Sequence, residues 1–149
     1  MNYLYIILII VIALLLWVIA IYNGLIRSRN RTKEAWADID VQLKRRYDLI
    51  PNLVEAVKGY ASHERELFEK VTQARANAIG AQGMKEKANA ENMLSDTLKS
   101  LFAVSENYPD LKSNQNFLAL QDEIAGTENR INFERDNYNK AVKDYQVGV

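Results

Sequence analysis

The stretch from Tyr3 to Tyr22 carries no charge and consists almost entirely of Leu, Ile, Val and Ala, and no charged residue comes before Arg27. A helix of this length rises about 30 Å, which matches the thickness of the hydrocarbon core of a bilayer. Its five Leu, seven Ile and two Val favour membrane insertion by about 4 to 8 kcal/mol in total. The stretch therefore predicts a transmembrane helix.

A cleavable signal peptide is the main alternative to a retained anchor. Signal peptides begin with a positive segment, have a shorter apolar stretch and end at a small-residue cleavage site. Here only Met1 and Asn2 precede the apolar stretch, and residues 21–24 do not form such a cleavage site. Aromatic residues lie toward both ends, as in interfacial belts: Tyr3, Tyr5, Trp17 and Tyr22. We expect residues 1–26 to be a retained anchor.

Charge sets the expected orientation. Basic residues follow the apolar stretch closely, at Arg27, Arg29, Arg31 and Lys33, and none precedes it. By the positive-inside rule, a single-pass protein of this kind has its N-terminus outside and the remainder in the cytoplasm. These cations could also contact anionic headgroups, at about 1 kcal/mol each. An ordinary stop-transfer flank is the simpler interpretation.

The composition of residues 27–149 excludes several classes of function. All 19 acidic and all 19 basic residues lie there, and this zero net charge argues against a nucleic-acid-binding surface. The absence of cysteine excludes disulfides, thiolate metal sites and a cysteine nucleophile, and it is compatible with a reducing compartment. A segment of this length holds one core, so we expect a single domain over 27–149.

That domain is predicted to be helical, because apolar residues recur at spacings of 3, 4 or 7 and no stretch alternates with period two. Four segments show this pattern, represented by Trp36, Ile39 and Leu43; Val54, Val57 and Ala61; Leu94, Leu98 and Leu101; and Ile124, Thr127 and Ile131. The near-heptad order of the last segment is typical of bundle and coiled-coil helices. The predicted fold is all-α: an N-terminal transmembrane helix followed by an antiparallel four-helix bundle with long helices.

Three breaks are expected between these helices. They are a turn at Asp48–Pro51, a polar glycine-containing loop at residues 80–83 and a proline turn within residues 107–112. Pro51 either follows a true turn or only kinks one long helix. We favour the turn, because the proline ring pushes Ile50 out of the α region. The first helix can also continue directly from the span, as one rod over residues 3 to 47 with a bend at Gly24.

This topology places the two proline turns together at the bundle end farthest from the bilayer. We predict that this distal tip contacts a partner protein through Arg45, Arg46, Asp48, Asn52, Tyr108 and Asp110. The alternative is that these residues only close the turns. The run Lys44-Arg45-Arg46 is interpreted as a charged helix face rather than a phosphate site.

The sequence offers little for catalysis. His63 is the single histidine, which excludes a two-histidine metal site within one chain, and it is interpreted as a solvated helix-surface residue. Carboxylates two residues apart, such as Asp38 with Asp40, point in different directions on a helix. No glycine-rich phosphate motif or nucleophile elbow is present. We predict no enzymatic activity, no cofactor and no metal site.

Two features point to self-association. Ala13, Ala20 and Gly24 place small residues on one face of the span, and the last two form a small-xxx-small pattern. The last helix is rich in side-chain amides, which either are simply exposed or form polar layers that set the register between helices or subunits: Gln121, Asn129, Asn132, Asn137 and Asn139.

The order of motifs resembles the LemA family over residues 22 to 145. The matching motifs include Tyr22-Asn23-Gly24-Leu25, Ile39-Asp40-Val41-Gln42-Leu43-Lys44-Arg45-Arg46, Asp48-Leu49-Ile50-Pro51-Asn52-Leu53-Val54, Tyr108-Pro109-Asp110-Leu111-Lys112 and Glu128-Asn129-Arg130-Ile131. The resemblance implies a bacterial inner-membrane protein with one N-terminal span and a cytoplasmic four-helix bundle. It implies no particular activity. Family members usually continue into a Phe-Pro-containing tail, whereas this sequence ends at Val149.

The predicted function is that of a membrane-anchored helical scaffold or adaptor that self-associates and presents a bundle surface to protein partners, without catalysis. The expected partners are the lipid bilayer, further copies of the chain and another membrane protein, but no nucleic acid. Two alternatives stay open. One is an oligomer that organises or shapes the membrane, and the other is a regulatory adaptor of a membrane protease or envelope-stress system.

Overall fold

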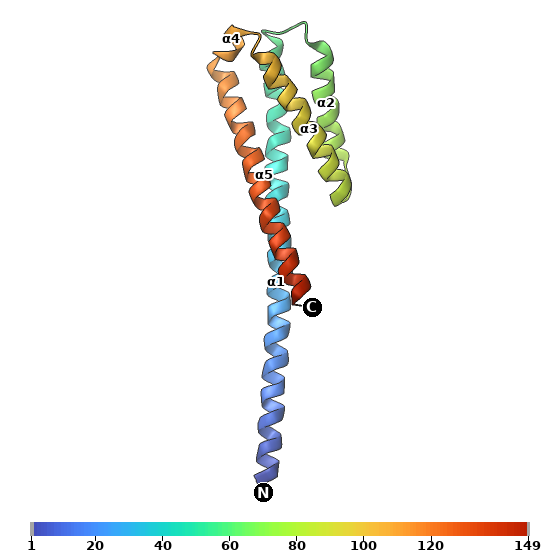
Figure 1. Ribbon diagram of the computed structural model, residues 1–149, viewed down its shortest axis with the longest axis vertical. Helices are drawn as coiled ribbons and strands as arrows, with labels where there is room; N and C mark the ends of the chain where they lie inside the picture. The colour runs from blue at the N-terminus through green and yellow to red at the C-terminus, as the bar shows by residue number, and fades with distance from the viewer. Residues whose placement is uncertain (1, 149) are drawn as a thin grey trace. The chain divides into compact units, whose positions relative to one another are not determined.

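The structure, a computed structural model, describes residues 2–148, and it describes the side chains of residues 3–148. It contains the helices α1 (Asn2–Lys58), α2 (Arg65–Gly80), α3 (Met84–Ser105), α4 (Pro109–Lys112) and α5 (Gln115–Val147) (Figure 1). The described part of the chain has no β-strand. The prediction of an all-α protein is confirmed.

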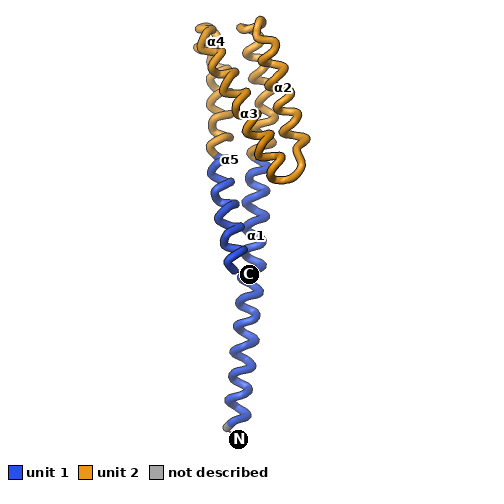
Figure 2. Tube along the Cα trace, turned by 45° about the vertical axis from the view of Figure 1, so that its right-hand side comes forward, with its two compact units in different colours: residues 1–41, 130–149 blue, residues 42–129 orange. Residues whose placement is uncertain are grey.

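The chain divides into two compact units, which Figure 2 shows in different colours. Unit 1 consists of residues 1–41 and 130–149, and unit 2 consists of residues 42–129. The helices α1 and α5 each contribute residues to both units, whereas α2, α3 and α4 belong to unit 2 alone. The predicted boundary after residue 26 separates a membrane anchor from the rest of the chain, whereas the two units are groups of residues that contact one another. The predicted boundary stays a prediction.

Unit 1 contains a short packed region and a long exposed apolar one. Ala35 and Ile39 on α1 and Ile131 on α5 are buried. The rings of Trp36 and Tyr138 pack with their centroids 5.5 Å apart at an interplanar angle of 56°, a tilted arrangement that aromatic pairs favour. Toward the N-terminus, by contrast, the large apolar side chains of residues 3–22 are all exposed.

Unit 2 has an apolar core to which every helix contributes buried residues. The spacing of its residues along each helix follows the helical period, so that one face of each helix is buried. Its largest buried side chains include Ile50 and Leu53 on α1, Phe68 and Val71 on α2, Leu94 and Leu101 on α3, Leu111 on α4, and Phe117 and Ile124 on α5. Leu94, Leu101 and Ile124 are among the apolar residues that helical periodicity predicts for the core.

The predicted turn at Asp48–Pro51 is wrong, because α1 continues through Pro51 to Lys58. A proline inside a helix has no N–H to donate to the carbonyl four residues earlier, here that of Tyr47. Arg75 on α2 replaces the missing donor: its Nε donates to the Tyr47 carbonyl oxygen across 2.7 Å. The proline ring disfavours the helical conformation of Ile50, but this side chain is only 1% exposed, and its burial in the core stabilises the helix there.

The chain reverses instead over residues 59–64, between α1 and α2. The continuation of α1 beyond the apolar stretch is confirmed over residues 3 to 47, and the helix extends 11 residues further than predicted, to Lys58. Gly24 lies within it, and the helix is uninterrupted there.

The other two predicted breaks are present. The helix α2 ends at Gly80 and α3 begins at Met84, after Gly83 with φ of 81° and ψ of 159°, a conformation that only glycine adopts readily. After α3, Pro109 occupies the first position of α4, where its missing N–H costs nothing. The side chain of Asn114 then accepts a bond from the N–H of Phe117 at 3.0 Å and caps α5.

Candidate functional site

Side-chain hydrogen bonds join the turn after α1 to the turn after α3 and to the turn between α4 and α5. Asn114 Nδ2 donates to the hydroxyl oxygen of Tyr60 at 3.0 Å, and the hydroxyl of Tyr108 donates to Glu64 Oε1 at 3.4 Å. We call these four residues the turn cluster. The sequence predicts that the Tyr108 turn meets a turn at Asp48–Pro51. Tyr108 instead bonds to the turn at residues 59–64, because α1 continues through Pro51.

The residues predicted for a partner contact lie in different environments. Arg45, Asp48, Asn52 and Asp110 are exposed, and Tyr108 is half-buried. Asp48 and Asn52 lie on α1 ahead of its end at Lys58, whereas Asp110 lies on α4. None of these four exposed residues contributes to the turn cluster. Their role as a contact surface stays a prediction.

Arg46 differs from the other predicted contact residues, because its side chain is 2% exposed. Its Nη1 lies 3.4 Å from Glu91 Oε2, and its Nη2 donates to Ser95 Oγ at 2.8 Å. The hydroxyl of Tyr47 donates to the other oxygen of Glu91. The interpretation of Arg46 as part of an exposed charged face is wrong. It belongs to a buried polar cluster of Arg46, Tyr47, Glu91 and Ser95.

The spacing of these residues in the sequence indicates that they are buried, although their charge suggests exposure. Arg46 lies three residues after Leu43 and four before Ile50, which places it on the buried stripe of α1. Glu91 likewise lies three residues before Leu94 on α3. A cation and an anion on the apolar faces of two helices are strong candidates for a buried pair, because an unpaired buried charge is very unfavourable.

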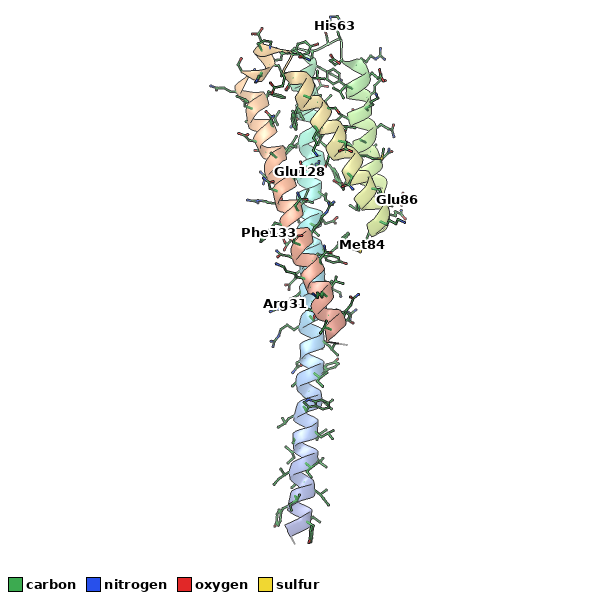
Figure 3. The ribbon with its side chains drawn as sticks, in the orientation of Figure 1. Arg31, His63, Met84, Glu86, Glu128 and Phe133 are labelled. Atoms are coloured by element: carbon green, nitrogen blue, oxygen red, sulfur yellow. The ribbon has the colours of Figure 1, made fainter. Side chains whose placement is uncertain are left out.

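The remaining candidate residues for chemistry lie at the surface. His63 is exposed, as predicted, but it lies in the turn between α1 and α2 and not on a helix (Figure 3). The Lys70 ammonium, which donates to the exposed Glu66 carboxylate, holds the pKa of Glu66 below its ordinary value. Such a surface pair on one helix is a common structural feature. Within residues 2–148, no group of three or more His, Asp or Glu side chains is arranged to hold a metal ion.

Most of the side-chain amides of α5 are exposed, which agrees with the first of the two interpretations given above. Asn129, Asn132 and Asn139 are exposed, and Gln121 and Asn137 are half-buried. Asn137 Nδ2 donates to Glu134 Oε2 on the same helix at 3.4 Å. A role of these amides between subunits stays a prediction.

The N-terminal part of α1 has the properties of a membrane segment. It is the single helix among the described residues that is long and apolar enough to cross a bilayer, and the apolar segment is not buried against other parts of the chain. Ala13, Ala20 and Gly24 are exposed on it, so they are accessible to a second helix. An exposed apolar surface of this size indicates a membrane-associated protein.

Comparisons with known proteins agree with this description. The model of the LemA family matches residues 35–149. The protein LemA of Metamycoplasma hominis is 28% identical over 128 residues, which cover 85% of this chain and 58% of that protein. The magnetosome protein MamQ 2 of Paramagnetospirillum magneticum is 22% identical over 165 residues, which cover 93% of this chain and 61% of that protein.

A further relative, the magnetosome protein MamQ of Magnetospirillum gryphiswaldense, is 22% identical over 154 residues, which cover 86% of this chain and 57% of that protein. The chain thus spans less than two thirds of the length of these curated relatives. The family match covers more than half of the chain and includes the turn cluster and the buried polar cluster. The chain belongs to the LemA family.

Proposed function

We propose that this protein is a membrane-anchored helical scaffold or adaptor that self-associates and presents its helical surface to protein partners, without catalysis. The observation that carries the proposal is the course of α1. The same helix has exposed apolar side chains over residues 3–22 and supplies buried core residues, such as Leu43 and Ile50, to unit 2. Residues 1–26 form the anchor in this proposal, and residues 27–149 form the soluble part.

The soluble part is proposed to be an antiparallel four-helix bundle formed by α1, α2, α3 and α5. Contacts within unit 2 support this arrangement, since α1 residues bond to both α2 and α3. These bonds are Arg75 to the Tyr47 carbonyl and Arg46 to Glu91. The bond between Asn114 and Tyr60 adds a link from the start of α5 to the end of α1.

The proposed setting is the inner membrane, with the N-terminus outside and the soluble part in the cytoplasm. The four cations between Arg27 and Lys33 support this orientation. The absence of catalysis is proposed because the buried polar residues Arg46, Glu91 and Thr127 each have a structural partner. Arg46 and Glu91 pair with each other, and the hydroxyl of Thr127 donates to the Ile124 carbonyl.

Similarity to proteins named for the magnetosome favours a second candidate function, an oligomer that organises the membrane. In this role many copies would pack through the small-residue face of the span, Ala13, Ala20 and Gly24. A regulatory adaptor of a membrane protease or envelope-stress system differs from both, because it requires one stoichiometric foreign partner.

Native mass measurement after gentle solubilisation in mild detergent tests the proposal. For the scaffold we expect a mass of several copies of the chain with bound foreign protein, and for the membrane organiser a larger particle of many copies. One copy with one foreign protein would instead support the regulatory adaptor. A single copy without any partner would contradict all three.

Charge-reversed variants test the contact surface in the same measurement. The double variant Asp48→Lys with Asp110→Lys changes two exposed acidic residues of the predicted contact. The matched control, Asp96→Lys with Asp122→Lys, changes two exposed acidic residues elsewhere in unit 2. We expect the first variant to lose bound foreign protein and the control to retain it. Equal retention by both would remove these residues from the contact surface.

A further inference from the structure

Unit 1 contains a cleft between α1 and the C-terminal part of α5, with a volume of about 370 Å³. Both views show these two segments of unit 1 side by side (Figures 1 and 2). The lining comes from two helical stripes: Ile21, Gly24, Leu25, Arg27, Ser28 and Arg31 on α1, and Ala141, Asp144, Tyr145 and Gly148 on α5. The volume is in the range of small-molecule sites.

Glycine keeps the α1 wall of the cleft open. A Cβ atom added at Gly24 would meet no heavy atom within 4 Å, so the space beside this residue is unfilled. The opposite wall is formed by Ala141, which is small, and by Tyr145, which brings an aromatic ring and a hydroxyl. Beside Gly24, the cleft is therefore a space that the side chains of this chain do not fill.

The charge of the lining favours an anionic group. Arg27 and Arg31 lie four residues apart on α1, which places them on the same face of the helix. Asp144 is the single acidic residue of the lining, so the lining residues include two arginines and one carboxylate. Guanidinium groups bind phosphate oxygens with two parallel hydrogen bonds, a geometry that a lysine ammonium does not offer.

The apolar end of the cleft is continuous with the membrane segment. Ile21 belongs to the uncharged stretch that ends at Tyr22, whereas Arg27 is the first charged residue of the chain. Residues 21 to 31 extend over about 15 Å of helix, which spans the boundary between hydrocarbon and headgroups. A ligand with an acyl chain beside Ile21 and Leu25 and a phosphate beside the two arginines matches this order of surfaces.

We propose that this cleft binds one anionic phospholipid from the leaflet on the side of the soluble part. The phosphate is held by Arg27 and Arg31, with the hydroxyl of Tyr145 as a further donor, and an acyl chain lies along Ile21, Gly24 and Leu25. The inference rests on the membrane anchoring of the proposed function. It goes beyond that function, because an ordinary basic flank attracts headgroups without a defined site.

Native mass spectrometry of the full chain in mild detergent, titrated with phosphatidylglycerol or phosphatidylcholine, tests the proposal. We expect one phosphatidylglycerol to be retained per chain and phosphatidylcholine to bind more weakly. Arg27→Gln with Arg31→Gln is expected to weaken phosphatidylglycerol binding by about tenfold or more. Arg29→Gln with Lys33→Gln removes the same charge from the same flank but outside the lining, and it is expected to bind like the unchanged protein.

Two further arms make the outcome decisive. Asp144→Asn removes the carboxylate of the lining and is expected to strengthen binding, whereas Asp136→Asn, an exposed residue of α5 outside the lining, is expected to leave it unchanged. Equal effects within either matched pair would show general attraction and overturn the proposal. Glycerol phosphate that binds as tightly as phosphatidylglycerol would assign the site to a soluble phosphate and also overturn it.

Carbonate extraction of the same variants separates this proposal from the proposed function. If the unchanged protein is released from membranes, the anchoring itself is wrong. If it stays in the membrane while the two double variants bind phosphatidylglycerol equally, only the lipid site is wrong. Arg31, one of the two substituted arginines of the lining, is labelled in Figure 3.

Discussion

Replacement of Glu91 by alanine is expected to lower the free energy of unfolding by about 3 to 5 kcal/mol. Glu91 is 1% exposed, and its carboxylate is bonded to both Arg46 and Tyr47. Its removal leaves the buried Arg46 guanidinium without the carboxylate of Glu91, which accounts for most of the expected loss. Urea unfolding of the full chain in mild detergent, followed by far-ultraviolet circular dichroism, measures the change.

Two variants make this prediction specific to the buried pair. Asp96→Ala changes an exposed acidic residue of the same helix and is expected to alter stability by less than about 0.5 kcal/mol. Arg46→Met combined with Glu91→Leu removes both charges and is expected to recover most of the loss, because apolar residues of similar size replace a buried pair well. A loss below about 1 kcal/mol for Glu91→Ala would show that the pair contributes little.

Replacement of Pro51 by alanine is expected to stabilise the protein by about 1 to 3 kcal/mol. Alanine restores the N–H that the Tyr47 carbonyl lacks within α1 and removes the ring from the helix interior. The gain is smaller than the full helix penalty of proline, because Arg75 already donates to this carbonyl and because proline restricts the unfolded chain. The same unfolding measurement applies.

The role of Arg75 is tested by combining the two changes. Arg75→Met alone is expected to cost about 1.5 to 3 kcal/mol, since a part-buried carbonyl loses a charged donor. In the Pro51→Ala background the same change is expected to cost about 1 kcal/mol less, because the backbone N–H of the introduced alanine now supplies a bond. Arg65→Met, at an exposed arginine of α2, is the control. Strictly additive effects would mean that Arg75 does not compensate for the proline.

The apolar core was predictable from the sequence, because it follows from the helical period alone. Leu43, Val57, Leu98 and Ile124 lie on the predicted stripes and are buried. The breaks at residues 80–83 and at Pro109 were also predictable, since glycine and proline act there through local backbone geometry. The local rule failed at Pro51, where a donor from the next helix, α2, satisfies the freed carbonyl.

The side-chain contacts were less predictable, because they depend on the exact end of each helix. Since α1 extends to Lys58, the turn that meets Tyr108 contains Tyr60 and Glu64 and not Asp48. Arg46 was misinterpreted for a related reason. A basic run suggests exposure, but the position of Arg46 relative to Leu43 and Ile50 decides its burial. Pairing with Glu91 on α3 is a tertiary contact, which one helix alone does not reveal.

Carbonate extraction of membranes that contain the intact chain tests whether the apolar part of α1, residues 3–22, lies within a bilayer and holds the remaining helices at its surface. Alkaline carbonate removes proteins held by charge or by protein contacts, but it does not extract a helix that spans the hydrocarbon core. We expect the intact chain to stay in the membrane pellet. Its recovery in the supernatant would show that residues 3–22 do not anchor the chain in a bilayer.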